Sequence, residues 1–433
     1  MYDSEAPDDW LVSSVYDLAR WKNGLAFRDI NFCGSGRPVI KIAELKGGIT
    51  HQTKFTNDQF DDAVRVIAGD FLFSWSGNPD TSIDIFRWAG GDGWLNQHIF
   101  KVHPQPVVDR EFFFFMMKWL RPRFAEIARN KQTTGLGHVT IADLKRMSVG
   151  VPSIDEQRRL VDVLGPIQEK LDLNLRMNAT LEGMARAIFK DWFVDFGPVR
   201  AKAEGRRPPG LADDIAALFP DKLDDDDKPM GWEFGSLSNY TDLKNGFAFS
   251  SSAWQTTGVP VVKIGSVRPS VVDLSNVSFV TEKIAEERSS FRLSPGDILV
   301  GLTGYVGEVG RVPPSDKSPL LNQRVACFRP RSCYAFVYAC VRQPTFKYFA
   351  EMKSHGSAQP NVSHKDLLTF PLVIAPDPLV AAFEQIVSHL FEKSLENHGE
   401  IHTLTMLRDL LLPKLMSGEV QLKDTEKALE AVA

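Results

Sequence analysis

The sequence predicts an α+β fold in which two similar mixed globular domains are separated by a pair of long antiparallel coiled-coil helices, related by a pseudo-twofold internal repeat. Three observations predict it: the chain repeats itself, each copy opens with short strand-like segments, and each copy closes with a long helical pattern. The 433 residues are enough for roughly two to four domains. A hydrophobic content of 43% is enough to form folded cores, which excludes wholesale disorder.

The internal repeat is carried by two short motifs. Lys22-Asn23-Gly24 recurs as Lys244-Asn245-Gly246, and Leu95-Asn96-Gln97 recurs as Leu321-Asn322-Gln323. The spacing between the copies drifts by only a few residues from one motif to the other, which small loop insertions explain. We therefore expect a duplicated structural unit.

The repeat and its changes in texture divide the chain into six parts. Short apolar runs bounded by turn residues, such as 39–42 and 259–264, predict strands, and 110–128 and 335–352 predict short helices. In chain order we expect a first globular domain at 1–150, a central long helix at 151–197, a linker at 198–230, a second globular domain at 231–373, a C-terminal long helix at 374–423 and a tail at 424–433.

Each predicted long helix carries mostly apolar residues at alternating steps of four and three, the pattern of a coiled-coil seam. Because each seam needs a partner and both have the same register, we expect the two helices to pair antiparallel. Asn174 and Asn397 fall near the middle, either as a buried pair that fixes the register or at a wet edge, and Pro166 predicts that the first helix kinks or restarts. The seam residues are Leu160, Leu164, Ile167, Leu171, Asn174, Leu181, Ile188, Phe383, Val387, Leu390, Asn397, Ile401, Leu404 and Leu411.

The length of the paired helices suggests a spacer. At a rise of 1.5 Å per residue, the first helix spans about 40 Å if it starts at Pro166 and about 60 Å if it starts at Ser153. One turn of B-DNA is roughly 34 Å. Two similar but non-identical domains held this far apart could therefore read two short sequences on one duplex, with an unread gap between them.

Several groups of residues resemble conserved regions of the type I restriction-modification specificity (S) subunits. The series that carries this resemblance is Pro152, Glu156-Gln157, Leu181-Glu182, Met184-Ala185, Ile188-Phe189, Trp192-Phe193-Val194-Asp195-Phe196, Pro198-Val199, Leu218-Phe219-Pro220, Gly231-Trp232 and Ser417-Gly418-Glu419-Val420. The resemblance covers nearly the whole chain and is specific in aggregate.

The resemblance implies a non-catalytic subunit with two target-recognition domains, each reading one half of a bipartite, asymmetric DNA site. It implies that the helices space the domains and dock modification subunits, which bind S-adenosylmethionine and methylate adenine N6, and ATP-dependent restriction subunits. The expected partners are therefore double-stranded DNA and these two kinds of subunit. The chain itself is expected to bind no cofactor, with S-adenosylmethionine, ATP and Mg on the partner subunits.

Composition is compatible with this interpretation. The net charge is -5, but residues 1–150 are balanced and residues 233–375 carry more Lys and Arg than Asp and Glu, which permits local positive surfaces. Four cysteines and no signal-like segment in residues 1–20 predict a reducing, cytoplasmic location. The longest apolar run, 112–117, is far shorter than a membrane span, so we expect no membrane association.

Catalytic and metal sites find little support in the sequence. There is no phosphate-binding Gly-rich loop followed by Lys-Ser/Thr, and Asn78-Pro79-Asp80 lacks the second proline and the aromatic residue of an adenine methyltransferase motif. The carboxylates and lysine of 220–228 lie in a linker, which favours a solvated charge run over a nuclease site. Metal ligation is not expected either: the spacing of Cys327, Cys333 and Cys340 favours buried thiols, and His398 and His402 are expected to be ordinary surface histidines. A self-contained nuclease or methyltransferase and a protein-protein scaffold remain the alternatives.

DNA contacts require Lys and Arg for phosphates and polar side chains for base edges. The repeated Lys-Asn-Gly motif cannot encode a difference between half-sites, and its alternative interpretation is a structural turn. We expect discrimination where the copies diverge, at 47–68 against 268–292 and at 75–94 against 303–320. The candidate DNA-binding residues are Lys22, Lys46, Lys54 and Arg87 in the first domain and Lys244, Arg268, Arg311 and Arg324 in the second.

Overall fold

The computed structural model describes residues 7–27, 32–50, 52–131, 136–275, 277–356 and 359–420. The expected tail at 424–433 and the last residues of the expected C-terminal helix lie outside the described residues. The chain forms two compact units, of which unit 1 comprises residues 1–170 and 405–433 and unit 2 comprises residues 171–404. Each long helix therefore contributes one part to each unit.

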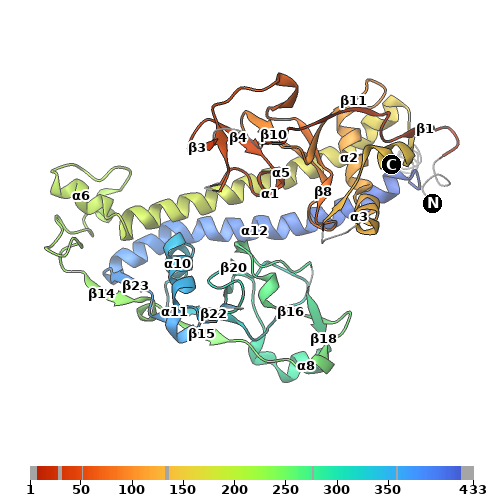
Figure 1. The fold of residues 1–433 in the computed structure, drawn as a ribbon. Helices are drawn as coiled ribbons and strands as arrows, with labels where there is room; N and C mark the ends of the chain where they lie inside the picture. Colours follow the sequence, from red (N-terminus) through yellow and green to blue (C-terminus); the bar gives the residue numbers. More distant parts are fainter. Residues whose placement is uncertain are drawn as a thin grey trace, which may run out of the picture. The chain divides into compact units, whose positions relative to one another are not determined.

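In its described residues, unit 1 contains two main sheets and, besides its parts of the long helices, four short α-helices (Figure 1). Its four-stranded antiparallel sheet has the order β2 (Ala19–Asn23), β11 (Ile99–Pro104), β7 (Phe71–Ser74), β9 (Asp84–Arg87). Its five-stranded sheet has the order β3 (Phe32–Cys33), β5 (Phe55–Thr56), β4 (Arg37–Ile40), β10 (Gly93–Leu95), β6 (Arg65–Val66). The shorter elements are β1 (Leu11–Ser14) paired with β13 (Ser148–Val151), β8 (Ser76–Gly77) paired with β12 (Gly137–His138), and α1 (Ile42–Gly47), α2 (Arg110–Trp119), α3 (Arg121–Asn130) and α4 (Ile141–Arg146).

The core of unit 1 is built around α2. Asp109 caps this helix by accepting hydrogen bonds from the backbone N–H groups of Glu111 and Phe112. All six residues of 112–117 are buried phenylalanines or methionines, so α2 is covered on all sides. Phe114 stacks on Phe71 of the four-stranded sheet with ring centroids 5.5 Å apart, which joins helix and sheet in one core.

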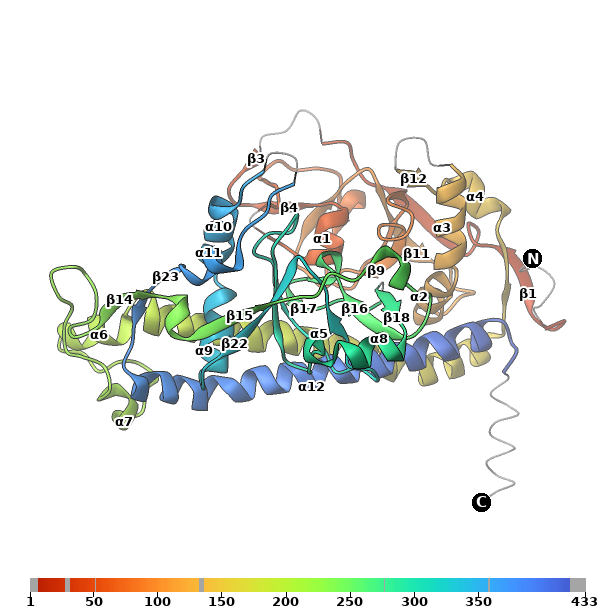
Figure 2. The same cartoon turned by 90° about the horizontal axis from the view of Figure 1, so that it is seen from below.

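Unit 2 repeats this organisation (Figure 2). Its five-stranded sheet has the order β15 (Thr241–Asn245), β22 (Val325–Pro330), β19 (Ile298–Gly301), β20 (Val309–Arg311), β17 (Ser270–Val271), and its three-stranded sheet has the order β18 (Ser278–Val280), β16 (Val259–Val262), β21 (Leu320–Leu321). A further pair joins β14 (Glu233–Ser236) and β23 (Pro371–Ile374), and the shorter helices are α6 (Gly197–Ala203), α7 (Asp213–Ala216), α8 (Glu282–Glu287), α9 (Tyr334–Val341), α10 (Pro344–Lys353) and α11 (His364–Leu368).

The two units share one topology, which confirms the predicted internal repeat. The order β2-β11-β7-β9 in unit 1 matches β15-β22-β19-β20 in unit 2. One short parallel strand pair also occurs at the matching place in both units, with Trp94 opposite Val39 in unit 1 and Leu320 opposite Val261 in unit 2.

The two repeated motifs contact each other within each unit. A Cβ atom added to Gly24 would lie 2.2 Å from the backbone oxygen of Asn96, and one added to Gly246 would lie 2.0 Å from that of Asn322. Only glycine fits against a backbone this close. The Lys-Asn-Gly motif therefore repeats because its glycine packs against the Leu-Asn-Gln motif.

The long helices are α5 (Ile154–Phe193) and α12 (Asp377–Met416), each of 40 residues. Pro166 lies inside α5, so the predicted restart of the helix at this proline is wrong. Proline removes one backbone donor, but its side chain is exposed and the packing of the helix on either side keeps the chain helical.

The two long helices run side by side (Figures 1 and 2) and antiparallel. In unit 1, Arg408 donates to Gln168 at 3.3 Å. In unit 2, Phe193 packs on Phe383 with ring centroids 5.3 Å apart. Partner numbers thus fall along α12 as they rise along α5, which confirms the antiparallel pair.

Asparagines near the middle of the helix pair are buried but do not pair as expected. Asn397 donates to Asn178 at 2.9 Å, and Asn174 donates to Glu400 at 2.8 Å. Asn174 is 0% and Asn397 1% exposed, so the expectation of a wet edge is wrong. Asn174 and Asn397 do not bond to each other, because the offset between the antiparallel helices places Asn178 opposite Asn397.

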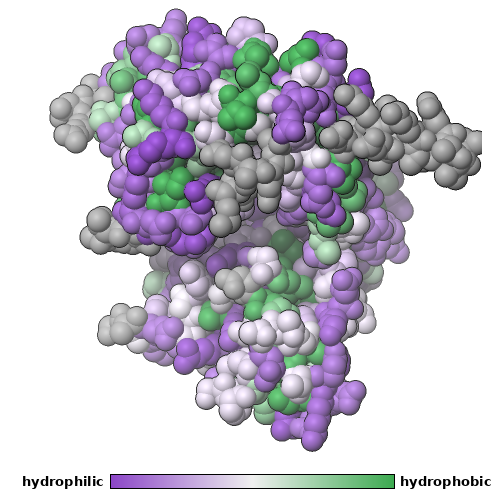
Figure 3. All heavy atoms as spheres, turned by 90° about the vertical axis from the view of Figure 1, so that its right-hand side faces the viewer, coloured by the Kyte–Doolittle hydropathy of each residue, from purple (hydrophilic) through white to green (hydrophobic). Residues whose placement is uncertain are grey.

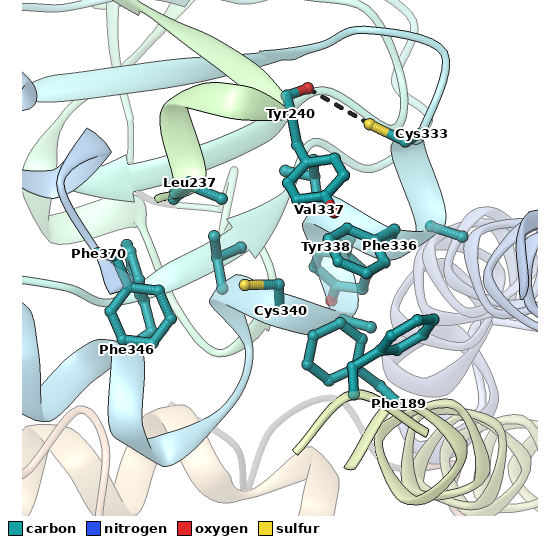
Figure 4. Close-up of a cluster of buried hydrophobic side chains, with 14 of the residues drawn as sticks. Phe189, Leu237, Tyr240, Cys333, Phe336, Val337, Tyr338, Cys340, Phe346 and Phe370 are labelled. Atoms are coloured by element: carbon teal, nitrogen blue, oxygen red, sulfur yellow. Dashed lines mark hydrogen bonds between the residues drawn. The ribbon is translucent and has the colours of Figure 1, made fainter. Parts of the chain in front are cut away.

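The core of unit 2 packs α9 against α5 through aromatic side chains. Figure 4 shows Phe189 of α5 pointing toward Phe336 of α9, and their ring centroids are 5.2 Å apart. Cys333 and Cys340 lie in the same core, where the Cys333 thiol donates to the Tyr240 backbone oxygen at 3.3 Å. Burial raises the pKa of Cys333 to about 11 and raises that of Cys340, so both thiols remain protonated at neutral pH.

Hydrophobic surface is dispersed on the face drawn in Figure 3, where green residues form separate patches among hydrophilic ones. In the part of the chain that the structure describes, no helix combines the length and the apolar character needed to span a bilayer.

Candidate nucleic-acid interface

Three of the four candidate lysines and arginines of unit 1 are exposed to solvent and form no ion pair with another described residue. Lys22 in β2 and Lys54 beside β5 are exposed. Lys46 in α1 is exposed and donates to Ser82 at 3.3 Å, and burial, followed by the nearby Arg121, lowers the pKa of its ammonium group.

Arg87, the fourth candidate of unit 1, is engaged within its own unit. Its guanidinium forms an ion pair with Glu111 and lies over the ring of Phe114 at 5.3 Å. Contact with a phosphate would require it to leave these partners, so the structure gives Arg87 a positioning role in the fold.

Two of the four candidates of unit 2 are exposed. Arg268 lies over the ring of Tyr305 at 5.1 Å, and Tyr305 is itself 52% exposed. Arg324 is exposed in a turn that precedes β22. Lys244 is half-buried, donates to the Ser290 backbone oxygen and lies over Phe291, so it is held by the fold.

Arg311 is buried, and its prediction as a direct DNA contact is wrong. Its side chain is 1% exposed and donates to the Phe391 backbone oxygen at 2.7 Å and to Ser394 at 3.0 Å, both on α12. Burial alone would lower the pKa of Arg311, but Tyr338, Tyr334 and Glu182 raise it, so the guanidinium stays charged. The sequence could not reveal this burial, because the covering residues lie 80 positions away.

Arg87 and Arg311 occupy equivalent places in the two units. Arg87 of β9 lies opposite Phe71 of β7, and Arg311 of β20 lies opposite Ile298 of β19 in the matching strand pair. Each guanidinium lies over an aromatic ring of the helix that follows the central strand, and for Arg311 this ring belongs to Tyr338. The repeat therefore explains why both arginines are present: they fasten the strand to the helix.

A buried polar cluster joins α5 to the globular part of unit 2. Glu182 is 5% exposed and lies 3.7 Å from Arg311 and 3.5 Å from Arg342. It also accepts hydrogen bonds from Tyr338 at 3.1 Å and from Ser270 at 2.6 Å. The seam pattern did not predict that Glu182 is buried and paired with two arginines, although a charged residue next to a helix seam is a signal for a buried partner.

His398 lies next to this cluster and corrects the expectation of a surface histidine. Its Nε2 atom is buried and has no hydrogen-bond partner in the part of the chain that the structure describes. Burial, and then Arg311, lower its pKa to about 4, against the opposing effect of Glu182. The imidazole is therefore neutral at physiological pH, while His402 is exposed as expected.

In each unit the Gln of the repeated Leu-Asn-Gln motif begins a two-residue turn that leads into the central strand. In unit 1 the turn is Gln97-His98, and in unit 2 it is Gln323-Arg324. The second residue of each turn is exposed. Its backbone oxygen accepts a hydrogen bond from the residue that follows the neighbouring strand, from Trp75 at 3.3 Å in unit 1 and from Leu302 at 2.9 Å in unit 2. One scaffold thus presents different side chains in the two copies.

Within the described ranges, no group of three or more His, Cys, Asp or Glu side chains is arranged so that it could hold a metal ion. The seam residues of α5 and α12 are all buried or half-buried. The geometry therefore offers a duplicated scaffold with exposed basic and polar side chains, and each copy includes part of both long helices.

These features define an internally duplicated two-domain protein on paired helices, and comparison with known proteins gives its family. The sequence matches the family described as Type I restriction modification DNA specificity domain over residues 7–183 and 229–392. The chain belongs to this family.

Known relatives agree with this assignment. The chain is 28% identical over 363 residues to the Type I restriction enzyme HindI specificity subunit of Haemophilus influenzae, covering 72% of this chain and 78% of that protein. It is 23% identical over 346 residues to the MjaIX specificity subunit of Methanocaldococcus jannaschii, covering 76% and 73%. The fold is similar to the crystal structure of a type I restriction-modification system S subunit from M. genitalium, with a TM-score of 0.51 and 18% identity over 94% of this chain and 96% of that one.

Proposed function

We propose that this chain is the DNA sequence-specificity subunit of a type I restriction-modification enzyme. In this proposal unit 1 and unit 2 each supply one target-recognition domain, and each domain reads one half of a bipartite, asymmetric site. The observation that carries the proposal is that the two units share strand order and the contact between their repeated motifs but differ in the exposed residues that follow, His98 in one and Arg324 in the other.

The helix pair sets the unread gap and docks the partner subunits in this proposal. Each long helix has 40 residues, about 60 Å at the usual rise per residue. Buried side chains from both helices, including the Asn178–Asn397 hydrogen bond, support a rigid spacer. A spacer of fixed length gives a gap of fixed length.

Catalysis is assigned to partners. Modification subunits would bind S-adenosylmethionine and methylate adenine N6, and restriction subunits would hydrolyse ATP with Mg, while this chain binds none of these cofactors. The modest net charge of -5 favours tight DNA binding only after partner subunits help to neutralise phosphates. We place the complex in the cytoplasm, where the DNA is.

The decisive assay compares the purified chain alone with the chain plus its modification subunit, each given S-adenosylmethionine and duplex DNA. Sequence-specific adenine methylation only with the partner is the expected result. Methylation by the chain alone would favour a self-contained enzyme instead, and an inability to direct methylation with the partner would favour a scaffold.

Exchange of one globular domain tests the division of labour. Replacing the globular part of unit 2 by that of a relative, with α5 and α12 kept, should change one half of the methylated sequence and leave the other half intact. A change in both halves, or in neither, would contradict the proposal.

A further inference from the structure

Arg324 adopts a backbone conformation that arginine rarely takes. Its φ angle is 69°, in the left-handed region where the Cβ atom of an L-residue crowds the following carbonyl oxygen. Glycine or asparagine would fit a turn of this kind with less strain. Strained residues cluster at functional sites, so this conformation makes the side chain of Arg324 a candidate for a functional role, although Ser332 of the same unit shares the conformation.

The guanidinium of Arg324 is free within its own unit. Its side chain is exposed, and in the described ranges it has no hydrogen bond, ion pair or ring contact. Arg311 and Arg342 of the same unit, by contrast, are both held by Glu182. Arg324 is therefore available to a ligand without breaking a contact of the fold.

The neighbours of Arg324 are side chains suited to a nucleic acid. On one side, Leu302 donates its backbone N–H to Arg324, which brings the loop of the exposed Tyr305 next to the turn. On the other side, Gly246 donates to Val325, so the repeated Asn245 lies nearby. The side chain of the exposed Asn245 lies within hydrogen-bond distance of the half-buried His364 ring, at 2.9 Å. Asn245 and His364 thus offer hydrogen-bond donors and acceptors on segments next to this turn, and Tyr305 lies in the loop that begins at Leu302.

The corresponding place in unit 1 is built on the same backbone bonds but presents a histidine. Trp75 donates its backbone N–H to His98, just as Leu302 does to Arg324. The rings of Trp75 and His98 lie 5.6 Å apart, and Trp75 Nε1 donates to Asn23 at 3.1 Å. The scaffold is thus shared and the presented side chain differs, as two domains with different targets require.

We propose that Arg324 is a specificity-determining residue that reads guanine in the half-site of the second domain, an inference that rests on the proposed function. Arginine forms a bidentate pair with O6 and N7 of guanine in the major groove, the commonest base-specific contact. The turn, fixed by Leu302 on one side, holds the start of the side chain rigidly, which favours a contact of this directional kind. In the first domain the equivalent position of the turn is occupied by His98, so a different side chain is exposed there.

The experiment uses the full chain assembled with its modification subunit and maps methylated sites by sequencing. Arg324→Gly should relax the requirement for guanine at one position of one half-site, by roughly 5-fold to 150-fold in discrimination, and leave the other half-site intact. Because glycine relieves the left-handed strain, the thermal midpoint of this variant should equal or exceed that of the native chain.

Two further variants separate base reading from other roles. Ser332→Gly is the matched control, because Ser332 is also exposed and has a φ angle of 58°, and it should leave both half-sites unchanged. Arg324→Lys keeps the charge but loses the bidentate geometry, so it should also relax the guanine requirement. If Arg324→Lys keeps the full requirement and Arg324→Gly weakens methylation equally at all sites, Arg324 is a phosphate contact and the inference is overturned.

The outcomes also separate this inference from the proposed function. If the native complex directs no methylation to a bipartite site, the proposed function fails. If the native complex does so and Arg324→Gly has the same sequence requirement, only the inference about Arg324 fails.

Discussion

Removal of Glu182 should destabilise unit 2 far more than removal of an exposed glutamate. Glu182→Ala deletes a carboxylate group that lies 3.7 Å from Arg311 and 3.5 Å from Arg342 and accepts hydrogen bonds from Tyr338, Ser270 and Arg342. The two arginine side chains are 1% and 15% exposed, so the variant leaves buried cations without their counter-charge. Breaking a buried pair in this way costs about 3–5 kcal/mol.

For a domain of this size that cost corresponds to a fall of about 6–20 °C in the thermal midpoint, at roughly 2–4 °C per kcal/mol. Differential scanning calorimetry of the full chain measures it. The control is Glu396→Ala, which removes an exposed ion pair with Lys393 at 3.1 Å and should change stability by less than about 1 kcal/mol. Glu182→Gln, which keeps the shape but loses the charge, should fall in between. Equal midpoints for Glu182→Ala and Glu396→Ala would refute the claim that the buried cluster fastens α5 to the globular part of unit 2.

Three other predictions follow from buried polar groups and close backbone contacts. Asn397→Leu leaves Asn178 Oδ1 without its donor and should lower the free energy of unfolding, measured with urea, by about 1–3 kcal/mol. The double variant Asn178→Leu/Asn397→Leu removes both polar groups and should recover most of this loss. A double variant as unstable as the single one would contradict this prediction. The pKa of His398 is lowered from 6.5 to about 4, so as the pH falls between these values the unfolded chain binds a proton at this histidine before the folded chain does, and the folded state loses stability. His398→Gln should reduce the slope of stability against pH in this range. An unchanged slope would contradict the prediction. Gly246→Ala places a Cβ atom 2.0 Å from the backbone oxygen of Asn322 and should lower the thermal midpoint. The control Gly265→Ala, whose Cβ atom meets nothing within 4 Å, should leave the midpoint unchanged. Similar midpoints would show that the contact between the two repeated motifs does not stabilise the fold.

The repeat and the helical seam could be predicted from sequence because both depend on periodicity. Residues such as Leu160 and Leu164 mark one face of α5 by their spacing alone, and both are buried. The offset between the two antiparallel helices could not be predicted in this way, because the same apolar spacing is also satisfied when one helix is shifted by one turn along the other. That shift decides that Asn397 meets Asn178 instead of Asn174.

The candidate DNA contacts could be predicted only in part, because charge and residue type do not reveal what covers a side chain. Arg311 and Arg324 are the same residue type in the same domain, yet one is buried under α12 and the other is exposed. The strain at Arg324 is also invisible in sequence, since φ depends on the folded turn. Pro166 shows the converse: local propensity predicts a break, and packing of a long helix overrides it.

The most direct test of the account lengthens the spacer and reads the gap. Seven residues, one heptad, are inserted after Lys170 in α5 and after Leu404 in α12, where the chain divides between the two units. The insertion adds about 10 Å to each helix, the length of about 3 base pairs. Mapping of methylated sites in the assembled complex should then show both half-sites unchanged and the unread gap longer by about that amount. An unchanged gap, or altered bases in either half-site, would contradict the claim that paired helices hold two readers at a fixed spacing.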